Sequence, residues 1–207
     1  MQILENGKPL DFKVTLPISL TALVQQISKQ INAEGRVLTS LSLNDVLYRL
    51  DALDPNKKVQ DGDKLVFSSE SPFAIARRSL EDALGQLDSF ASEVDHVVSD
   101  LIRGNKDLAF SRFSKFLGEF RGLVLLLQTL ESTFHWDYAS ISLSSGENKT
   151  VHDFIEHLIS LLSQTKSAME TGDMVTLADL LDYEIRILFT GDLKKTLESL
   201  LPLLPHE

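Results

Sequence analysis

The chain lacks cysteine altogether and has no apolar run longer than the five residues 123–127. Without cysteine, disulfides, thiolate zinc sites and thiol nucleophiles are all excluded. The run at 123–127 is far shorter than the roughly 20 apolar residues that cross a bilayer. The first five residues also lack the basic and apolar segments of a secretory signal. We therefore expect a soluble, cytoplasmic protein without membrane association.

Basic residues are scarce in the C-terminal two thirds of the chain. Residues 1–70 contain eight Lys and Arg against nine Asp and Glu, whereas residues 71–207 contain twelve against twenty-one. An acidic surface repels phosphate backbones, so nucleic-acid binding is not expected. The local bases Arg112, Lys115 and Arg121 are interpreted as the solvated face of a helix.

The hydrophobic pattern changes at residues 67–72. Before this point, short apolar runs are interrupted by turn residues; after it, apolar residues recur every three or four positions almost to the end. This change predicts an α+β protein with two domains, a β-rich one over residues 1–70 and a helical one over residues 71–207.

The first domain is predicted to begin with a hairpin and a helix. Asn6-Gly7 favours a tight turn, and residues 10–16 alternate apolar and polar side chains as a half-buried strand does. Apolar residues at helical spacing follow, and Gly35 closes that helix. They are Leu20, Leu23, Val24, Ile27 and Ile31.

Two further strands and a final strand complete the first domain. Residues 36–43 alternate, with Val37, Thr39, Leu41 and Leu43 on one face, and Asn44-Asp45 is a turn into residues 46–50. Asp61-Gly62 is a tight turn before the last strand, which ends at Phe67.

This order of elements resembles the β-grasp (ubiquitin-like) superfold. The turn Asp61-Gly62-Asp63 is similar to the one before the last strand in the sulfur-carrier and tRNA-synthetase-associated branches. Those carriers, like ubiquitin, end the strand with a free diglycine, whereas Phe67 is followed here by Ser-Ser-Glu-Ser-Pro. Without a glycine carboxylate there is nothing to adenylate or thiocarboxylate. The resemblance therefore implies a docking or dimerising module.

The second domain opens with two long helices. Ser71-Pro72 is a typical helix start, and a heptad stripe predicts a helix of about 30 residues that ends at Gly104. The stripe comprises Phe73, Ala76, Leu80, Ala83, Leu87, Phe90, Val94, Val97 and Leu101. A second stripe contains four phenylalanines, which we interpret as bundle core. It comprises Phe113, Phe116, Phe120, Leu123, Leu127, Leu130 and Phe134.

After a predicted loop over residues 140–149, two more helical stretches follow. One starts near Thr150, and the next starts after Thr171-Gly172-Asp173, with Asp173 as N-cap. Gly191 interrupts the last stretch. Short connections favour antiparallel neighbours, so an antiparallel four-helix bundle with a broken last helix is expected.

The segment 172–184 resembles the signature stretch of a family of bacterial proteins with no assigned activity. That family is similar in plan, with a small N-terminal domain and a helical body. The resemblance implies a bacterial origin and no known chemistry. The bundle is also similar, in fold class only, to flagellin-export chaperones.

Two polar or aromatic clusters are candidate partner-binding sites. Asp179, Asp182, Tyr183 and Arg186 form the first, with Asp182 and Arg186 spaced for an ion pair on one helix face. It is either a functional patch or an ordinary solvated face.

The second cluster lies at the end of the phenylalanine-rich helix. Trp136 and Tyr138 could anchor a partner, because exposed aromatic side chains bury a large area at little entropic cost. The alternative is that Trp136 caps the bundle core.

The histidines give no clear catalytic or metal site. His96 points outward on its helix, as a phosphotransfer histidine would, but the residues after it do not fit such a site. His152 and His157 are five residues apart and so lie on different faces of a helix, unlike an i, i+4 ligand pair. We expect no catalytic residues, no cofactor and no metal.

These observations favour a non-enzymatic protein-interaction or scaffold protein. An export chaperone or regulatory adaptor that covers a client helix is the alternative, and a phosphotransfer protein or enzyme is a third interpretation. A protein partner and a homodimer are expected.

Overall fold

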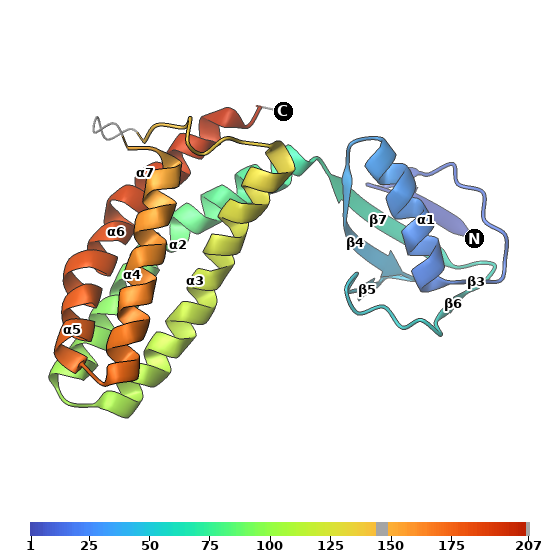
Figure 1. Cartoon of the computed structure of the whole chain (residues 1–207). Coiled ribbons are helices and arrows are strands. Elements are labelled where there is room, and N and C mark those ends of the chain that lie inside the picture. The colour runs from blue at the N-terminus through green and yellow to red at the C-terminus, as the bar shows by residue number, and fades with distance from the viewer. Residues whose placement is uncertain (144–148, 206–207) are drawn as a thin grey trace. The chain divides into compact units, whose positions relative to one another are not determined.

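The computed structural model describes residues 1–143 and 149–205 (Figure 1). The chain is an α+β protein in which a small N-terminal sheet is followed by helices. It separates into two compact units, Met1–Ile75 and Ala76–Glu207. Among the described residues, no helix has both the length and the apolar composition that a bilayer crossing needs.

The main sheet of the N-terminal unit has five strands in the order β2-β1-β7-β4-β5. Its central strands β1 (Gln2–Glu5) and β7 (Lys64–Glu70) are parallel, and the other neighbours are antiparallel. The remaining strands are β2 (Lys8–Pro9), β4 (Val37–Leu43) and β5 (Val46–Tyr48). A separate pair joins β3 (Ile18–Ser19) to β6 (Lys58–Val59).

Helix α1 (Leu20–Ala33) packs its apolar stripe on one face of this sheet (Figure 1). Ser19 caps it by accepting a hydrogen bond from Ala22 N at 3.2 Å, and Gly35 ends it with a φ of 74°. All five predicted stripe residues are buried. They share a core with Leu41, Leu65 and Phe67 of the strands.

The strand predicted over residues 10–16 is wrong. Leu10, Phe12 and Val14 are half-buried against the core and alternate with exposed residues, so one face is buried as expected. Pairing with β1 nevertheless ends at Pro9, except for one hydrogen bond from Leu10 N to Ile3 O of 2.9 Å. Alternating apolar and polar residues indicate that one face of a segment is buried, but they do not show that a neighbouring strand is there to pair with it.

A β-bulge changes which side chains of β4 face the core. The register with β7 shifts between Leu38 and Ser40, so one residue is added to β4. Leu41 and Leu43 are buried as predicted, whereas Val37, beyond the bulge, is 40% exposed and Leu38 packs against the core instead. The predicted face is therefore correct only on one side of the bulge.

The C-terminal unit is built from helices, several of which begin at a capping residue that the sequence marks. They are α2 (Pro72–Ile102), α3 (Lys106–Phe134), α4 (Val151–Thr171), α5 (Met174–Asp179), the π-helical turn η1 (Leu180–Ile185), α6 (Arg186–Thr190), α7 (Asp192–Leu200) and the 3₁₀ turn η2 (Leu201–Leu203). The predicted starts are confirmed, since Ser71 accepts from Ala74 N at 3.0 Å and Thr150 forms a capping box with Asp153. Of the loop predicted over 140–149, residues 144–148 lie outside the described residues. Ser142 and Thr150 in its flanks form a β-bridge.

Four phenylalanine rings from three helices meet in the centre of the helical unit. Phe90 of α2 lies 6.0 Å from Phe116 and 6.4 Å from Phe120, both on α3. Phe189 of α6 lies 5.4–5.7 Å from all three, with centroid distances in the range where aromatic pairs attract. Phe189 is fully buried, although no sequence motif singled it out.

The predicted break in the last helical stretch is confirmed at Gly191. This residue has φ −109° and ψ −98°, outside the helical range. A Cβ atom at this position would lie 3.0 Å from Ile187 O, which is closer than most Cβ contacts, so the position favours glycine. After the break, α7 returns Leu193, Leu197 and Leu200 to the core.

Replacing Phe189 by alanine should destabilise the helical unit by about 3–5 kcal/mol, because it leaves a cavity among three other rings. The free energy of unfolding of the full chain in urea measures this. Ile187→Ala, on the same helix but 56% exposed, is the matched control and should change it by less than about 1 kcal/mol. Equal losses in the two variants would contradict the assignment of Phe189 to the core.

Candidate functional site

A groove of about 370 Å³ lies between the end of α2 and the segment α5–η1. Its walls are apolar apart from Tyr183 and two carboxylates, both from the acidic cluster that the sequence singled out. The lining residues are Val98, Leu101, Ile102, Met174, Val175, Ala178, Asp179, Asp182 and Tyr183.

The tight connection between α4 and α5 fixes one end of this groove. Gly172 ends α4 in the left-handed conformation, with a φ of 71°. Asp173 then caps α5, because its carboxylate accepts from Thr176 N at 3.0 Å and from Thr176 Oγ1 at 2.8 Å. These two residues set the direction in which α5 leaves the turn and runs along α2.

The π-helical turn η1 orients the polar side chains of the groove. Arg186 N donates to Leu181 O, five residues back, so the turn is wider than an α-helical one. Leu181 and Ile185 point into the core, while Tyr183 is 62% exposed. Such turns are frequent at functional sites, and sequence periodicity did not reveal this one.

Large apolar side chains at the groove are exposed to solvent. Ile102 is 76% exposed and Val175 is 73% exposed, and Tyr183 lines the same groove. Single exposed apolar residues are ordinary, but a group around a groove indicates a binding surface. The heptad pattern that ends at Leu101 did not predict this surface, because Ile102 is the residue after the last position of the buried stripe.

Arg186 is held by two carboxylates beside the groove. Its Nη2 lies 3.0 Å from Asp182 Oδ1, which confirms the predicted ion pair, and its Nε lies 3.5 Å from Asp95 Oδ1 on α2. The Nε also donates to Asp182 O at 3.2 Å. The sequence did not indicate Asp95, because it is ninety-one residues away in the chain. The structure thus brings Asp179, Asp182, Tyr183 and Arg186 together, with the guanidinium engaged.

Trp136 and Tyr138 lie apart from this groove. They follow α3, whose end is at the opposite end of the helical unit from α5 (Figure 1). Tyr138 is buried, its hydroxyl donates to Leu127 O at 2.6 Å, and burial raises the pKa of this phenol well above its usual range. Its side chain therefore belongs to the interior. Trp136 is half-buried and stacks on Phe134 at 5.2 Å, as a residue that caps the core does.

The histidines are dispersed over the surface. His96 is exposed on α2, as predicted, and His152 Nε2 lies 3.4 Å from Glu156 Oε1. Within residues 1–143 and 149–205, no group of three or more His, Asp or Glu side chains is placed to hold a metal ion. His206 lies outside the described residues.

Arg112 is only partly the solvated base that the sequence predicts, because its side chain is 39% exposed but is paired with a buried carboxylate. Its Nε lies 3.1 Å from Oδ2 of Asp100, a carboxylate whose side chain is only 10% exposed at the end of α2. The pair joins α2 to α3 beside their connecting turn. Separating the two helices would leave the Asp100 carboxylate buried without its partner, which is costly. The ion pair therefore constrains how α2 and α3 pack at this turn.

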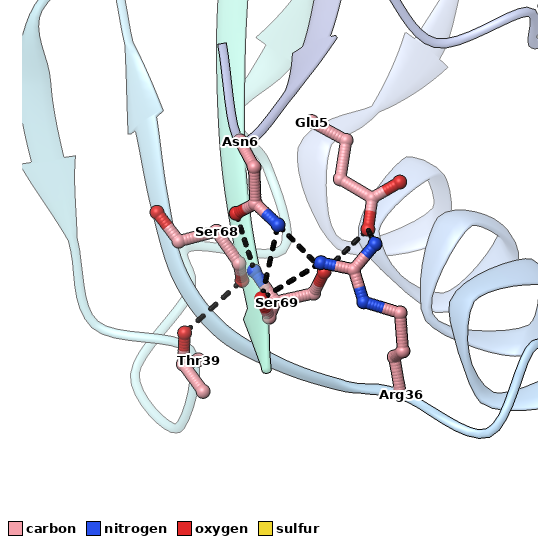
Figure 2. Close-up of polar contacts among 6 residues, drawn as sticks. All are labelled: Glu5, Asn6, Arg36, Thr39, Ser68 and Ser69. Carbon is pink, nitrogen blue, oxygen red and sulfur yellow. Dashed lines mark hydrogen bonds and ion pairs between the residues drawn. The ribbon is translucent and has the colours of Figure 1, made fainter. Parts of the chain in front are cut away.

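The N-terminal unit contains a separate polar cluster (Figure 2). Ser69, buried on the core face of β7, donates its hydroxyl to Glu5. The main chain of Ser69 is bracketed by Asn6, which accepts from Ser69 N and donates to Ser69 O, both at 3.0 Å. Arg36 contacts Ser69 O at 2.9 Å and Glu5 at 3.0 Å. These groups satisfy one another, so the cluster ties the ends of β1 and β7 to the start of β4.

The charged cap at Asp173 makes the α4–α5 connection sensitive to acid. Hydrogen bonds from Thr176 N and then the Thr176 hydroxyl lower the pKa of Asp173 below its usual value. A lowered pKa contributes stability above the unfolded-state value near 3.9, and this is lost as the pH falls through the folded-state pKa.

Asp173→Asn should therefore flatten the loss of unfolding free energy between about pH 5 and pH 2.5, because asparagine still caps but does not titrate. Thermal or urea unfolding across this range measures the slope. Asp173→Ala, which removes the cap, should be less stable than Asp173→Asn at pH 7. Identical slopes in the wild type and Asp173→Asn would contradict the role of the charge.

Residues 78–191 match a family described as Domain of unknown function (DUF8042). The match covers more than half of the chain and includes every residue that lines the groove. It also includes the segment 172–184, on which the resemblance to a family without assigned activity rests. No curated protein and no solved structure matches the chain. The chain belongs to the DUF8042 family.

Proposed function

We propose that this chain is a non-enzymatic protein-interaction module whose helical unit binds a partner in the groove between α2 and α5–η1. The main support for the proposal is that Ile102, Val175 and Tyr183 are exposed around this groove. The two charged residues that line the groove are both aspartates. An interface core of aromatic and aliphatic anchors with a charged rim is typical of protein recognition.

The charge of the groove favours one kind of occupant. Asp179 and Asp182 line it, and the nearby guanidinium of Arg186 is held by Asp182 and Asp95. The helical domain as a whole carries twelve basic against twenty-one acidic residues. The partner is therefore an amphipathic helix that places apolar side chains in the groove and Lys or Arg against the rim.

We also propose that the N-terminal unit has a β-grasp fold and that the C-terminal unit is a four-helix bundle. The strand order with a parallel central pair, and a helix between the first hairpin and β4, support a β-grasp fold for the N-terminal unit. If α5, η1, α6 and α7 are one interrupted helical stretch, the C-terminal unit is a four-helix bundle. A bacterial origin and a cytoplasmic location are parts of the proposal that rest on the sequence alone.

The alternative function is an export chaperone or regulatory adaptor that covers a client helix. It is favoured by a second groove of about 470 Å³ between α3 and α4, whose lining is more uniformly apolar. Phe113, Leu117, Leu162 and Met169 line it, with Lys166 and Glu170 paired at 3.7 Å on its rim. A client helix for this groove would be recognised by its apolar face without a basic rim.

A pair of synthetic peptides distinguishes these functions. The first is a fluorescent amphipathic helix with a leucine face and a lysine face, and its twin carries glutamate in place of lysine. At about 0.1 M salt, the full chain should bind the basic peptide at least about tenfold more tightly than the twin, and added salt should reduce the difference. Fluorescence anisotropy measures both affinities.

Substitutions in the two grooves then locate the contact. Val175→Lys and Tyr183→Ala should each weaken the basic peptide by about tenfold or more, as interface anchors do. Ile159→Lys on α4 introduces the same charge at a 61% exposed site outside either groove and should have no effect. Equal binding of the twins together with loss of binding in Leu162→Lys would overturn the proposal in favour of the chaperone.

A further inference from the structure

The two edges of the N-terminal sheet differ in their protection against pairing. The edge strand β2 consists of Lys8 and Pro9, a charged residue and one without a backbone N–H. The opposite edge strand, β5, consists of Val46, Leu47 and Tyr48 and contains neither lysine nor proline. Lysine and proline are common devices that prevent a sheet edge from adding another strand. The edge at β5 is therefore open to pairing.

The side chains of β5 are also unusually exposed for apolar residues. Leu47 is 74% exposed and Val46 is 57% exposed. An exposed apolar strand at a sheet edge is the feature that soluble proteins normally avoid, unless the edge is covered in the functional state.

The hairpin geometry identifies the backbone groups that are free. Asn44 and Asp45 both have positive φ, at 51° and 65°, so the two-residue turn closes on the pair Leu43–Val46. Along an antiparallel ladder, hydrogen-bonded pairs alternate with pairs that do not bond each other. The N–H and C=O groups of Leu47, the next residue, therefore face away from β4 toward the free edge.

We propose that β5 pairs antiparallel with β5 of a second copy of this chain, about a two-fold axis at Leu47. In this arrangement the free N–H and C=O groups of the two Leu47 residues bond each other. The two five-stranded sheets become one continuous sheet across the axis. This surface is distinct from the groove of the helical unit, and the inference does not depend on the proposed function.

Charge complementarity is what selects a second copy as the occupant. In the register centred on Leu47, Asp45, the turn residue just before β5 in one copy, comes close to Arg49, the residue just after β5 in the other, and the two-fold axis repeats this pair. Both side chains are largely exposed, 83% for Asp45 and 80% for Arg49. A second copy of the chain necessarily has the matching acidic residue before β5 and basic residue after it, whereas an unrelated strand would not be expected to have them.

The present partners of these two residues do not oppose the new contact. Asp45 lies 3.4 Å from Lys64, and Arg49 lies 2.7 Å from Asp51. Both pairs are on the surface, where solvent screens the charges, although Arg49 holds Asp51 through two hydrogen bonds. Each charge can therefore still act on a charge across the axis. Because the paired strand is short, the dimer is expected to be weak and to depend on protein concentration.

Two charge reversals test the register. In Asp45→Arg alone, and in Arg49→Asp alone, like charges face each other across the axis, so each variant should self-associate at least about tenfold more weakly than the wild type. In an equal mixture of the two variants, opposite charges face each other at both positions. The mixture should therefore recover association, as heterodimers. Sedimentation equilibrium on the full chain, up to about 500 µM, measures all four cases.

Leu47→Lys tests the edge without touching the turn. It should abolish the dimer, because lysine at an edge strand blocks pairing, while Leu125→Lys, a 49% exposed site on α3, should leave the dimer unchanged. A wild-type chain that stays monomeric throughout, or a dimer unaffected by Leu47→Lys, would overturn the proposal. Failure of two folded variants to associate when mixed would overturn it as well, with circular dichroism establishing that both are folded.

Discussion

The packing of four phenylalanine rings is the interaction on which the helical unit and its groove depend. Phe90, Phe116, Phe120 and Phe189 come from α2, α3 and α6, segments up to about a hundred residues apart in the chain. Their burial fixes where α6 lies against α2. Since η1 runs directly into α6, the same contact places the π-helical turn beside α2 and so forms the groove between them.

This arrangement explains why the groove is suited to recognition. The inward side chains of η1, Leu181 and Ile185, are needed for the core, so only the outward ones are free to serve a partner. Of these, Asp182 already pairs with Arg186, and Tyr183 is open to solvent. An apolar groove with a carboxylate rim offers contact area and charge selectivity, which are the two requirements of a docking surface.

In the N-terminal unit too, the residues that stabilise the fold differ from those that are exposed for binding. The cluster of Glu5, Asn6, Arg36 and Ser69 joins three strand ends through groups that satisfy one another. At the far side of the sheet, β5 leaves backbone groups and Leu47 uncovered. The polar groups of this cluster thus stabilise the sheet from within, and the exposed apolar side chains of β5 remain available for binding.

The sequence by itself determined the features that depend on neighbours within about four residues. The helix starts at Ser71, Thr150 and Asp173 and the break at Gly191 were all predictable, because side-chain capping and the conformational freedom of glycine act locally. The acidic cluster with its Asp182–Arg186 pair was predictable for the same reason.

Only the tertiary structure decided which patterned residues meet a distant partner. The alternation over residues 10–16 found a buried face but no strand to pair with, and the bulge in β4 exposed Val37. Tyr138 became a core residue while Tyr183 stayed exposed, although nothing local distinguishes them. The physical reason is that burial and pairing are properties of two segments at once, and their meeting is set by the packing of the whole core.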